Sequence, residues 1–384
     1  MKVGVLFHDK YESDWKDVCL DHLERNRAQK NRVKRRMMKP NLERRSLLEG
    51  VGAATLGVGA LSVLGGFPSV LADNVAEEKL GIKRGGRGTG WLWDDRYLLH
   101  SQRKGHPESP ERLKAIGAQL KNSGLLNDLV PLKSEVESED YISMVHSKEH
   151  LGLVKKQAHD ESICRLAVSG ALSAVEAVCS AKVQNAFVAL RPPGHHAANK
   201  GEFGFCFYNN IAVAARYAQK RFNIGKVLIV DWDYHHGDGT EWAFYDDPSV
   251  LFFSTHALKA FPGTGSPNRV GSGRGKGFNI NVPLPNGAGD RDIIQAFESE
   301  LLPAVEQFRP ELVLVSAGFD AREEDLLGDF NITDAGFAKL TQMVMSIAKK
   351  YSGSRVVSLL EGGYNTRGLA LAVEAHLKVL LKEG

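Results

Sequence analysis

The chain has 384 residues, of which 43% are hydrophobic and 25% charged, and its formal net charge is +3. This composition is typical of a globular protein and excludes a largely disordered chain. Residues 1–72 hold 13 Lys and Arg against 8 Asp and Glu, which leaves 36 against 38 in residues 73–384. Because this larger part carries no excess of positive charge, we expect no direct binding of nucleic acid. The four cysteines form no Cys-x-x-Cys pair, so the sequence indicates neither a disulfide framework nor a cysteine zinc site.

Residues 1–72 are predicted to be an N-terminal extension that carries an export signal. The run Arg44-Arg45-Ser46-Leu47-Leu48 precedes an apolar, glycine-rich stretch over 51–64, and Val70-Leu71-Ala72 ends on a small residue that suits cleavage. The segment resembles a twin-arginine signal, which would place the mature protein in the bacterial periplasm. The apolar stretch is shorter than the ~20 residues that cross a bilayer, so we expect no stable membrane span.

The position of the arginine pair is unusual for such a signal, since the pair begins 43 residues into the chain. Met37 or Met38, just upstream, is therefore an alternative start of translation. The other interpretation of the apolar stretch is a buried, glycine-rich helix of the domain, and the protein would then be cytoplasmic.

Residues 73–88 are predicted to be a linker, and residues 89–384 to form one domain in which short apolar runs alternate with longer amphipathic ones. The runs expected as strands are 186–190, 226–230, 250–254, 277–282, 311–316 and 355–360. The runs expected as helices are 109–121, 166–181, 209–221, 290–307, 334–350 and 367–382. This alternation predicts an α/β fold with a mostly parallel central sheet and helices on both faces. In such folds, ligands bind beyond the carboxyl ends of the strands.

Reactive side chains follow four of the expected strands. The four segments are Arg191-Pro192-Pro193-Gly194-His195-His196, Asp231-Trp232-Asp233-Tyr234-His235-His236-Gly237-Asp238-Gly239, Ala317-Gly318-Phe319-Asp320 and Glu361-Gly362-Gly363-Tyr364. Asp231, Asp233 and His235 occupy alternate positions, so they would point to one side of a strand and its continuation, where they can converge on a cation. A metal site at this edge of the sheet is the first hypothesis, and a solvated polar turn is the alternative.

The same segments carry a family resemblance. The motifs, in chain order, are Gly105-His106-Pro107-Glu108-Ser109-Pro110-Glu111-Arg112, Arg191 to His196, Gly204-Phe205-Cys206-Phe207-Tyr208-Asn209-Asn210, Asp231 to Gly239, Phe261-Pro262-Gly263-Thr264-Gly265, Ser316 to Asp320 and Glu361 to Asn365. Over about 89–384 the chain resembles the metal-dependent histone deacetylase family, with features of its class II and bacterial deacetylase-like branch. The resemblance implies a three-layer, arginase-like α/β/α fold and hydrolysis of an N-acetylated amine.

By this resemblance, Asp233, His235 and Asp320 are the expected metal ligands. Three protein ligands leave a position open for water or substrate, as a catalytic zinc site requires. Zn²⁺ is the expected ion, and Fe²⁺ or Co²⁺ would accept the same ligands. The family also binds a structural potassium ion where Asp231, Asp233 and Ser254 lie, so a K⁺ site is expected there.

The resemblance also implies roles for the remaining site residues. His195 and His196 match a tandem general acid/base pair, oriented by Asp231 and Asp238 respectively. One histidine takes the proton of the attacking water and one delivers a proton to the leaving amine. Tyr364 matches the donor that binds the tetrahedral oxyanion.

Phe205 and Phe261 match the aromatic walls of a narrow substrate channel, although either one taken alone could be a core residue. Leu327 falls where polyamine-selective relatives carry a glutamate, so acyl-lysine or another acylated amine with an uncharged stem is the expected substrate. An acetylpolyamine amidohydrolase is the alternative, with Glu323 and Glu324 close by. Asp325-Leu326-Leu327-Gly328 lacks the proline usual in the family, which predicts a less rigid loop.

Other functions fit the sequence less well. A cysteine hydrolase that uses Cys206 leaves the aspartates unexplained, and an arginase-like ureohydrolase needs more bridging carboxylates than the sequence around Asp320 supplies. A non-catalytic reader of acyl-lysine would not need both histidines and Tyr364. The glycine-rich run 271–277 precedes a strand rather than a helix, so it does not fit a phosphate-binding loop.

Overall fold

The computed structural model describes residues 88–383. The predicted export signal, the alternative starts and the linker, apart from Gly88, lie outside the described residues. The centre of the fold is an eight-stranded sheet in the order β2-β1-β3-β8-β7-β4-β5-β6. Every pair of neighbouring strands is parallel, as the sequence predicted for most of the sheet. The strands are β1 (Thr89–Leu92), β2 (Val130–Leu132), β3 (Asn185–Val188), β4 (Val227–Asp231), β5 (Val250–Ala257), β6 (Asn279–Leu284), β7 (Leu312–Ala317) and β8 (Val356–Leu360).

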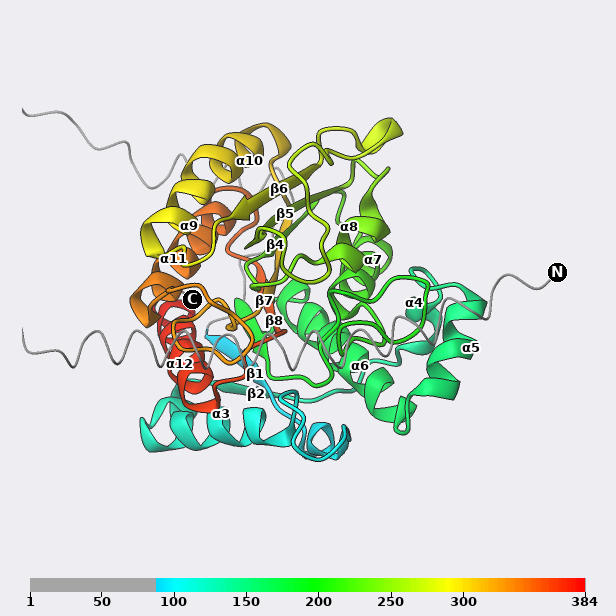
Figure 1. The fold of residues 1–384 in the computed structure, drawn as a ribbon, viewed down its shortest axis with the longest axis vertical. Helices are drawn as coiled ribbons and strands as arrows, with labels where there is room; N and C mark the ends of the chain where they lie inside the picture. Colours follow the sequence, from blue (N-terminus) through cyan, green and yellow to red (C-terminus); the bar gives the residue numbers. More distant parts are fainter. Residues whose placement is uncertain (1–87, 384) are drawn as a thin grey trace, which may run out of the picture. The chain divides into compact units, whose positions relative to one another are not determined.

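Helices cover both faces of the sheet. They are α3 (Pro110–Asn122), α4 (Glu139–Ile142), α5 (Lys148–Gln157), α6 (Glu161–Cys179), α7 (Asn210–Phe222), α8 (Asp238–Phe244), α9 (Asp290–Ala296), α10 (Leu302–Phe308), α11 (Asp334–Tyr351) and α12 (Thr366–Glu383). In Figure 1, α3, α11 and α12 lie on one side of the strands, and α6 and α7 lie on the other. The domain is therefore the predicted three-layer α/β/α structure.

The central strands are apolar along their whole length because both of their faces are covered. All residues of β3, β4, β7 and β8 are buried. In antiparallel sheets one face is often exposed to water, so apolar and polar residues alternate along each strand. Parallel strands between two helical layers are buried on both faces, so their sequences are continuous apolar runs. Helix α6 is likewise long and apolar enough to cross a membrane, but 67% of its most apolar stretch is buried inside the domain, as in a core helix.

All six predicted strands are present, with ends within three residues of those expected. The predicted helix over 290–307 is divided into α9, a π-helical turn (Phe297–Leu301) and α10. Strands β1 and β2 were not predicted, because four and three residues are too few to establish a pattern. Helices α4, α5 and α8 were not predicted either.

Candidate active site

The site is assembled at the carboxyl ends of four strands that lie next to one another, β3, β8, β7 and β4. Each of these strands is followed by one of the four reactive segments. Asp231, the last residue of β4, pairs in register with Ser316 of β7. Residues from 195 to 364 therefore meet at one edge of the sheet, which is the location expected for a ligand in such folds.

Asp233, His235 and Asp320 form a compact group, with their ligand atoms within 4.8 Å of one another. Nδ1 of His235 lies 3.2 Å from Asp233 Oδ1 and 3.0 Å from Asp320 Oδ2. A single ring N–H cannot be directed at both carboxylates with good geometry, whereas a cation between the three atoms can bind all of them. The arrangement fits a divalent cation held by two carboxylates and one imidazole.

Backbone amides hold the carboxylates of this group in place. Gly362 N–H donates to Asp233 Oδ2 (2.8 Å), and Tyr234 N–H donates to Asp320 Oδ1 (2.9 Å). The approach is so close that it requires glycine: a Cβ on Gly362 would lie 2.3 Å from Asp320 Oδ2, and one on Gly318 would lie 2.0 Å from Asp233 Oδ2. The two glycines therefore form a cradle around the carboxylates.

Electrostatics in the group also fit a cation. Burial raises the pKa of Asp320 to about 7, and the neighbouring charge of Asp233 adds to this effect. Burial lowers the pKa of His235, but its hydrogen bonds with both aspartates outweigh burial and raise the pKa to about 9. Two crowded, buried carboxylates favour any positive charge placed between them. Zn²⁺, Fe²⁺ and Co²⁺ all accept such oxygen and nitrogen ligands.

Two histidine–aspartate pairs lie beside this group. Nδ1 of His195 is 3.0 Å from Asp231 Oδ2, and Nδ1 of His196 is 2.8 Å from Asp238 Oδ1. The two imidazole centroids are 4.0 Å apart, and both side chains are buried. His195 Nε2 lies 3.8 Å from Asp233 Oδ1, so this ring directly borders the metal group.

The two histidines differ in protonation. Burial lowers the pKa of His195, but the charges of Asp233 and Asp231 outweigh it and hold this pKa well above its ordinary value. Burial lowers the pKa of His196 to about 3, and the positive charge of His195 lowers it further, against the hydrogen bond from Asp238. The pKa of His195 is therefore the higher of the two, so His195 takes up a proton more readily than His196.

Tyr364 is held with its hydroxyl protonated. Its backbone N–H donates to Asp325 Oδ2 (2.7 Å), and the guanidinium of Arg112 lies 5.0 Å from the centre of its ring. Burial raises the pKa of the Tyr364 phenol well above its ordinary value. The hydroxyl is consequently a hydrogen-bond donor at neutral pH.

Aromatic rings border the site from two directions. Phe205 meets His106 edge to face, with centroids 4.5 Å apart, and also contacts Tyr364 (6.1 Å). Phe261 meets His196 edge to face at 4.9 Å and is packed against a third ring, Phe203, at 5.0 Å. The sequence identified Phe205 and Phe261 but not Phe203, because Phe203 lies outside the motifs. Leu327 is also buried, with 7% of its surface exposed.

The expected potassium residues lie close together at the end of β4 and β5. Ser254 pairs in register with Asp231, and its hydroxyl is 3.0 Å from Nδ1 of His256. Asp231 Oδ1 accepts a hydrogen bond from the backbone N–H of Asp233 (3.1 Å). A potassium ion at this place remains a prediction.

Several buried charged residues of the site lie within the sequence motifs, but the sequence does not predict a role for them. Arg191 donates to both oxygens of Glu108 (2.5 and 2.7 Å), and Arg112 donates to Glu108 and to the carbonyl oxygens of Glu361 and Gly363. Charged residues are mostly exposed unless they are paired, and these three are buried as partners of one another. The network connects the segment before α3 to the turn that carries Tyr364.

A second group of metal-ligand types, His100, Asp160 and Cys164, contains none of the predicted site residues and borders the Glu108–Arg191 network, with His100 Nε2 3.8 Å from Glu108 Oε2. The Asp160 carboxylate accepts from Ser101 N–H (2.6 Å) and lies 2.9 Å from His100 Nδ1. Burial raises the pKa of the Cys164 thiol, which therefore keeps its proton. We interpret this group as a structural hydrogen-bond cluster.

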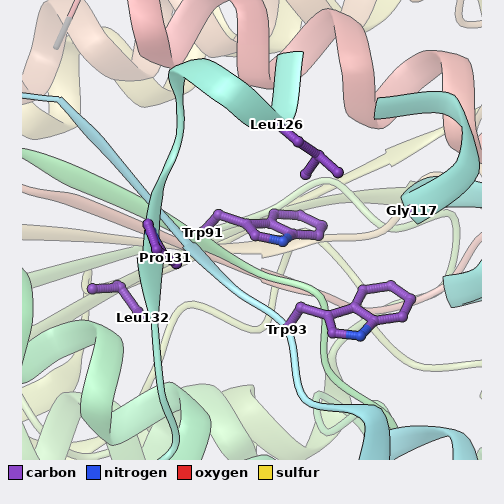
Figure 2. A pocket seen from close by; sticks show the side chains of 6 residues that line it. All are labelled: Trp91, Trp93, Gly117, Leu126, Pro131 and Leu132. Carbon is purple, nitrogen blue, oxygen red and sulfur yellow. The ribbon is translucent and has the colours of Figure 1, made fainter. Parts of the chain in front are cut away.

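An apolar pocket of about 320 Å³ is lined by none of the predicted site residues. Figure 2 shows the indole rings of Trp91 and Trp93 side by side in it, with Leu126 above them. Its lining offers no titratable side chain, so it has no group for acid/base chemistry.

The fold and the edge-of-sheet group of Asp, His and Tyr side chains define an α/β protein with a candidate metal centre. The chain matches the histone deacetylase domain over residues 106–380. It is 38% identical to histone deacetylase 15 of Arabidopsis thaliana over 315 residues, 76% of this chain and 56% of that protein. It is 35% identical to a probable deacetylase of Archaeoglobus fulgidus over 299 residues, 73% of this chain and 82% of that protein.

Human histone deacetylase 9 is 35% identical over 348 residues, which make up 77% of this chain and 34% of that protein. The crystal structure of the HDA15 HD domain is similar, with a TM-score of 0.72 at 37% identity, covering 77% of this chain and 90% of that chain. The chain therefore belongs to the histone deacetylase family, a family of hydrolases that act on amide bonds. It spans little more than half the length of the plant relative.

Proposed function

We propose that the protein is a zinc-dependent amidohydrolase, which hydrolyses the amide of an N-acylated lysine or a related acylated amine to the free amine and the acid. The observation that supports this most directly is the convergence of Asp233, His235 and Asp320 beside two histidines that are each held by an aspartate. A neutral base, a proton donor and a hydrogen-bond donor for the carbonyl oxygen are the groups that amide hydrolysis requires.

Asp233, His235 and Asp320 are the residues that would hold the divalent cation. When bound, such a cation polarises the substrate carbonyl and lowers the pKa of a water molecule beside it. Because Nδ1 of His196 faces Asp238, Nε2 of this neutral ring is the atom that accepts the proton of the attacking water. The protonated His195 then supplies a proton to the leaving nitrogen. Asp231 keeps the His195 ring in the matching orientation.

The Tyr364 hydroxyl donates a hydrogen bond to the carbonyl oxygen while negative charge develops on it. Its high pKa prevents the phenol from ionising, so the donor is present throughout the physiological pH range. Arg112 and Asp325 hold the ring and its backbone, so little reorganisation is needed during the reaction.

The aromatic side chains favour a substrate with a narrow, uncharged stem. Phe205 beside Tyr364 and Phe261 beside His196 suit the methylene chain of an acyl-lysine. Leu327 is buried and carries no charge, so it offers nothing to the cationic chain of an acetylpolyamine. We therefore favour acyl-lysine over acetylpolyamine as the substrate class.

The test compares the metal-loaded wild type with Tyr364→Phe and His196→Ala on acetyl-lysine peptides, acetylpolyamines and small acylated amines. We expect turnover of acetyl-lysine peptides by the wild type and a fall of about 10²–10³-fold in kcat for Tyr364→Phe. Tyr217→Phe is the matched control, because it removes a hydroxyl that binds Glu176 on α6 instead of facing the site. Tight binding of acyl peptides without hydrolysis would instead support a reader of acyl-lysine.

We also propose that residues 1–72 direct export by the twin-arginine route, which would make the mature enzyme periplasmic. The experiment is peptide mass mapping of the exported protein. An amino terminus shortly after Ala72 would support the proposal, and one well upstream would contradict it.

A further inference from the structure

Glu361 is a buried carboxylate at the centre of the site. The proposed reaction assigns it no role. Glu361 directly follows β8 and is 0% exposed. It belongs neither to the metal group nor to the two histidine–aspartate pairs. A carboxylate in such a place needs several hydrogen-bond donors, because an unpaired buried charge is strongly unfavourable.

The donors come from two other segments of the site. Gly194 N–H (2.7 Å) and His195 N–H (3.2 Å) both donate to Oε2 of Glu361. The hydroxyl of Ser316, on β7, donates to Oε1 (3.0 Å). One side chain therefore joins the ends of β8 and β7 to the segment 194–196, which follows β3.

The segment 194–196 carries the acid/base pair, so its position decides where both imidazoles lie. The ring of His195 is held at Nδ1 by Asp231, and its main chain is held by Glu361. Thr240 N–H holds the carbonyl side of this main chain by donating to the His195 oxygen (3.1 Å), so Glu361 holds the amide side. Without Glu361 the amides of Gly194 and His195 are free to shift, and with them His196, whose ring is 4.0 Å away. Ser316 holds the Glu361 carboxylate in a fixed position relative to Asp231, because Ser316 and Asp231 pair in register on neighbouring strands.

We infer that Glu361 is a positioning residue, which fixes the main chain of Gly194 and His195 and thereby aligns the two histidines with the metal ligands. This inference rests on the proposed function. One carboxylate oxygen of Glu361 accepts hydrogen bonds from the two backbone amides, and the other accepts from the Ser316 hydroxyl. Glu361 acts through His195 and His196 and does not touch the substrate.

The test compares Glu361→Ala with Glu361→Gln. Alanine removes both acceptors and leaves two buried amides unpaired, so we expect kcat to fall about 10–100-fold, as for other groups that orient a reactive side chain. KM and the bound metal per chain should not change. Glutamine keeps one oxygen for the two amides, and the Ser316 hydroxyl can accept from its amide group. We therefore expect Glu361→Gln to recover most of the lost kcat.

Ser352→Ala is the matched control for general loss of stability. Ser352 is 0% exposed and donates to the carbonyl oxygen of Pro310 (2.8 Å), at the amino ends of β7 and β8, opposite the site. It should lower the melting temperature without changing kcat. An unchanged kcat in Glu361→Ala, or a loss of bound metal together with kcat, would overturn the inference.

Crystal structures of wild type, Glu361→Ala and Glu361→Gln make the inference testable independently of turnover. Should the wild type hydrolyse none of the substrates, the proposed function fails, and the position of residues 194–196 alone decides about Glu361. Displacement of this segment in the alanine variant, with recovery in the glutamine variant, supports the positioning role. An unmoved segment in Glu361→Ala contradicts it.

Discussion

Nδ1 of His195 lies 3.0 Å from Oδ2 of Asp231, and the other oxygen of the same carboxylate accepts the backbone N–H of Asp233. Asp231 is fully buried, so one side chain sets both the orientation of the His195 ring and the course of the chain towards Asp233, a proposed metal ligand. The second pair differs: Asp238 binds His196 but also Lys200 (3.2 Å), at the surface.

Asp231→Asn should therefore be more harmful than Asp238→Asn. His195 and the amide of Asp233 donate to different oxygens of Asp231, and an asparagine replaces one of these oxygens by an NH2 group, so one donor loses its acceptor. We expect a fall in kcat and a loss of about 3–5 kcal/mol in the free energy of unfolding, because a buried charge pair is broken. Asp238→Asn should lower kcat about 10–100-fold with little change in stability. Urea unfolding and steady-state kinetics check both variants. Equal losses of stability would contradict the expectation that the more deeply buried Asp231 contributes more to stability than Asp238.

Gly362→Ala should abolish metal binding while the chain still folds. The added Cβ would lie 2.3 Å from Asp320 Oδ2 and 2.7 Å from Asp233 Oδ2, so both proposed ligands must move. The matched control is Gly152→Ala in α5, where a Cβ meets nothing within 4 Å and alanine is the better helix former by about 1 kcal/mol. Metal analysis after gel filtration is the measurement. Full metal content in Gly362→Ala would show that the carboxylates do not hold the ion.

Removal of the metal should reversibly abolish turnover and lower stability. With free zinc at about 100 times its Kd, binding to the native state alone stabilises it by about 2.7 kcal/mol. We expect a chelator to lower the melting temperature and zinc to restore both stability and turnover. Asp320→Ala, which lacks one proposed ligand, should show no such shift. The same zinc-dependent shift in that variant would place the ion elsewhere.

The protein should lose stability below pH 6.5 partly because of His376. This residue of α12 is fully buried, with Nδ1 2.7 Å from Thr341 Oγ1 and Nε2 3.0 Å from Ser358 Oγ. Burial lowers its pKa to about 3, whereas in the unfolded chain it titrates at its ordinary value of 6.5. Between these values the unfolded state binds the extra proton, so stability falls as pH falls, by about 1.4 kcal/mol per unit.

His376→Gln removes this titration and isolates it from that of other buried histidines. The variant should be less stable than wild type at pH 7, but the difference should narrow by about 2 kcal/mol at pH 5. Urea unfolding of both proteins at the two pH values is the measurement. A difference that stays constant with pH would mean that His376 titrates with the same pKa in the native and the unfolded protein.

The sequence was sufficient for the parallel sheet and for the residues that meet at its edge, because both depend on local patterns. Continuous apolar runs mark strands that are buried on both faces, and reactive residues directly after them must lie at one edge. Strand order was not predictable, since nothing in the run 355–360 shows that β8 lies between β3 and β7. For the same reason the role of Glu361 was missed: its partners, Gly194 and Ser316, are distant in sequence.

Local sequence patterns also did not predict the short helices and strands or the side chains that support the site. Phe203 contacts Phe261, which is far from it in sequence, so the residues around Phe203 do not predict the contact. The sequence distinguishes Asp325 only by the missing proline of its loop, yet its carboxylate accepts hydrogen bonds from the backbone amides of Tyr364 and Asn365. Such contacts are determined by tertiary packing.

The strand order also bears on how the protein is made. β8 is the last strand to leave the ribosome, yet it takes an interior position between β3 and β7. Gly362, which anchors Asp233, and Tyr364 both follow it. Until these residues are synthesised, the histidine segment after β3 and Asp320 after β7 have no strand to bring them together. A chain that lacks β8 would therefore be inert, and binding of the proposed metal would coincide with insertion of β8 into the sheet.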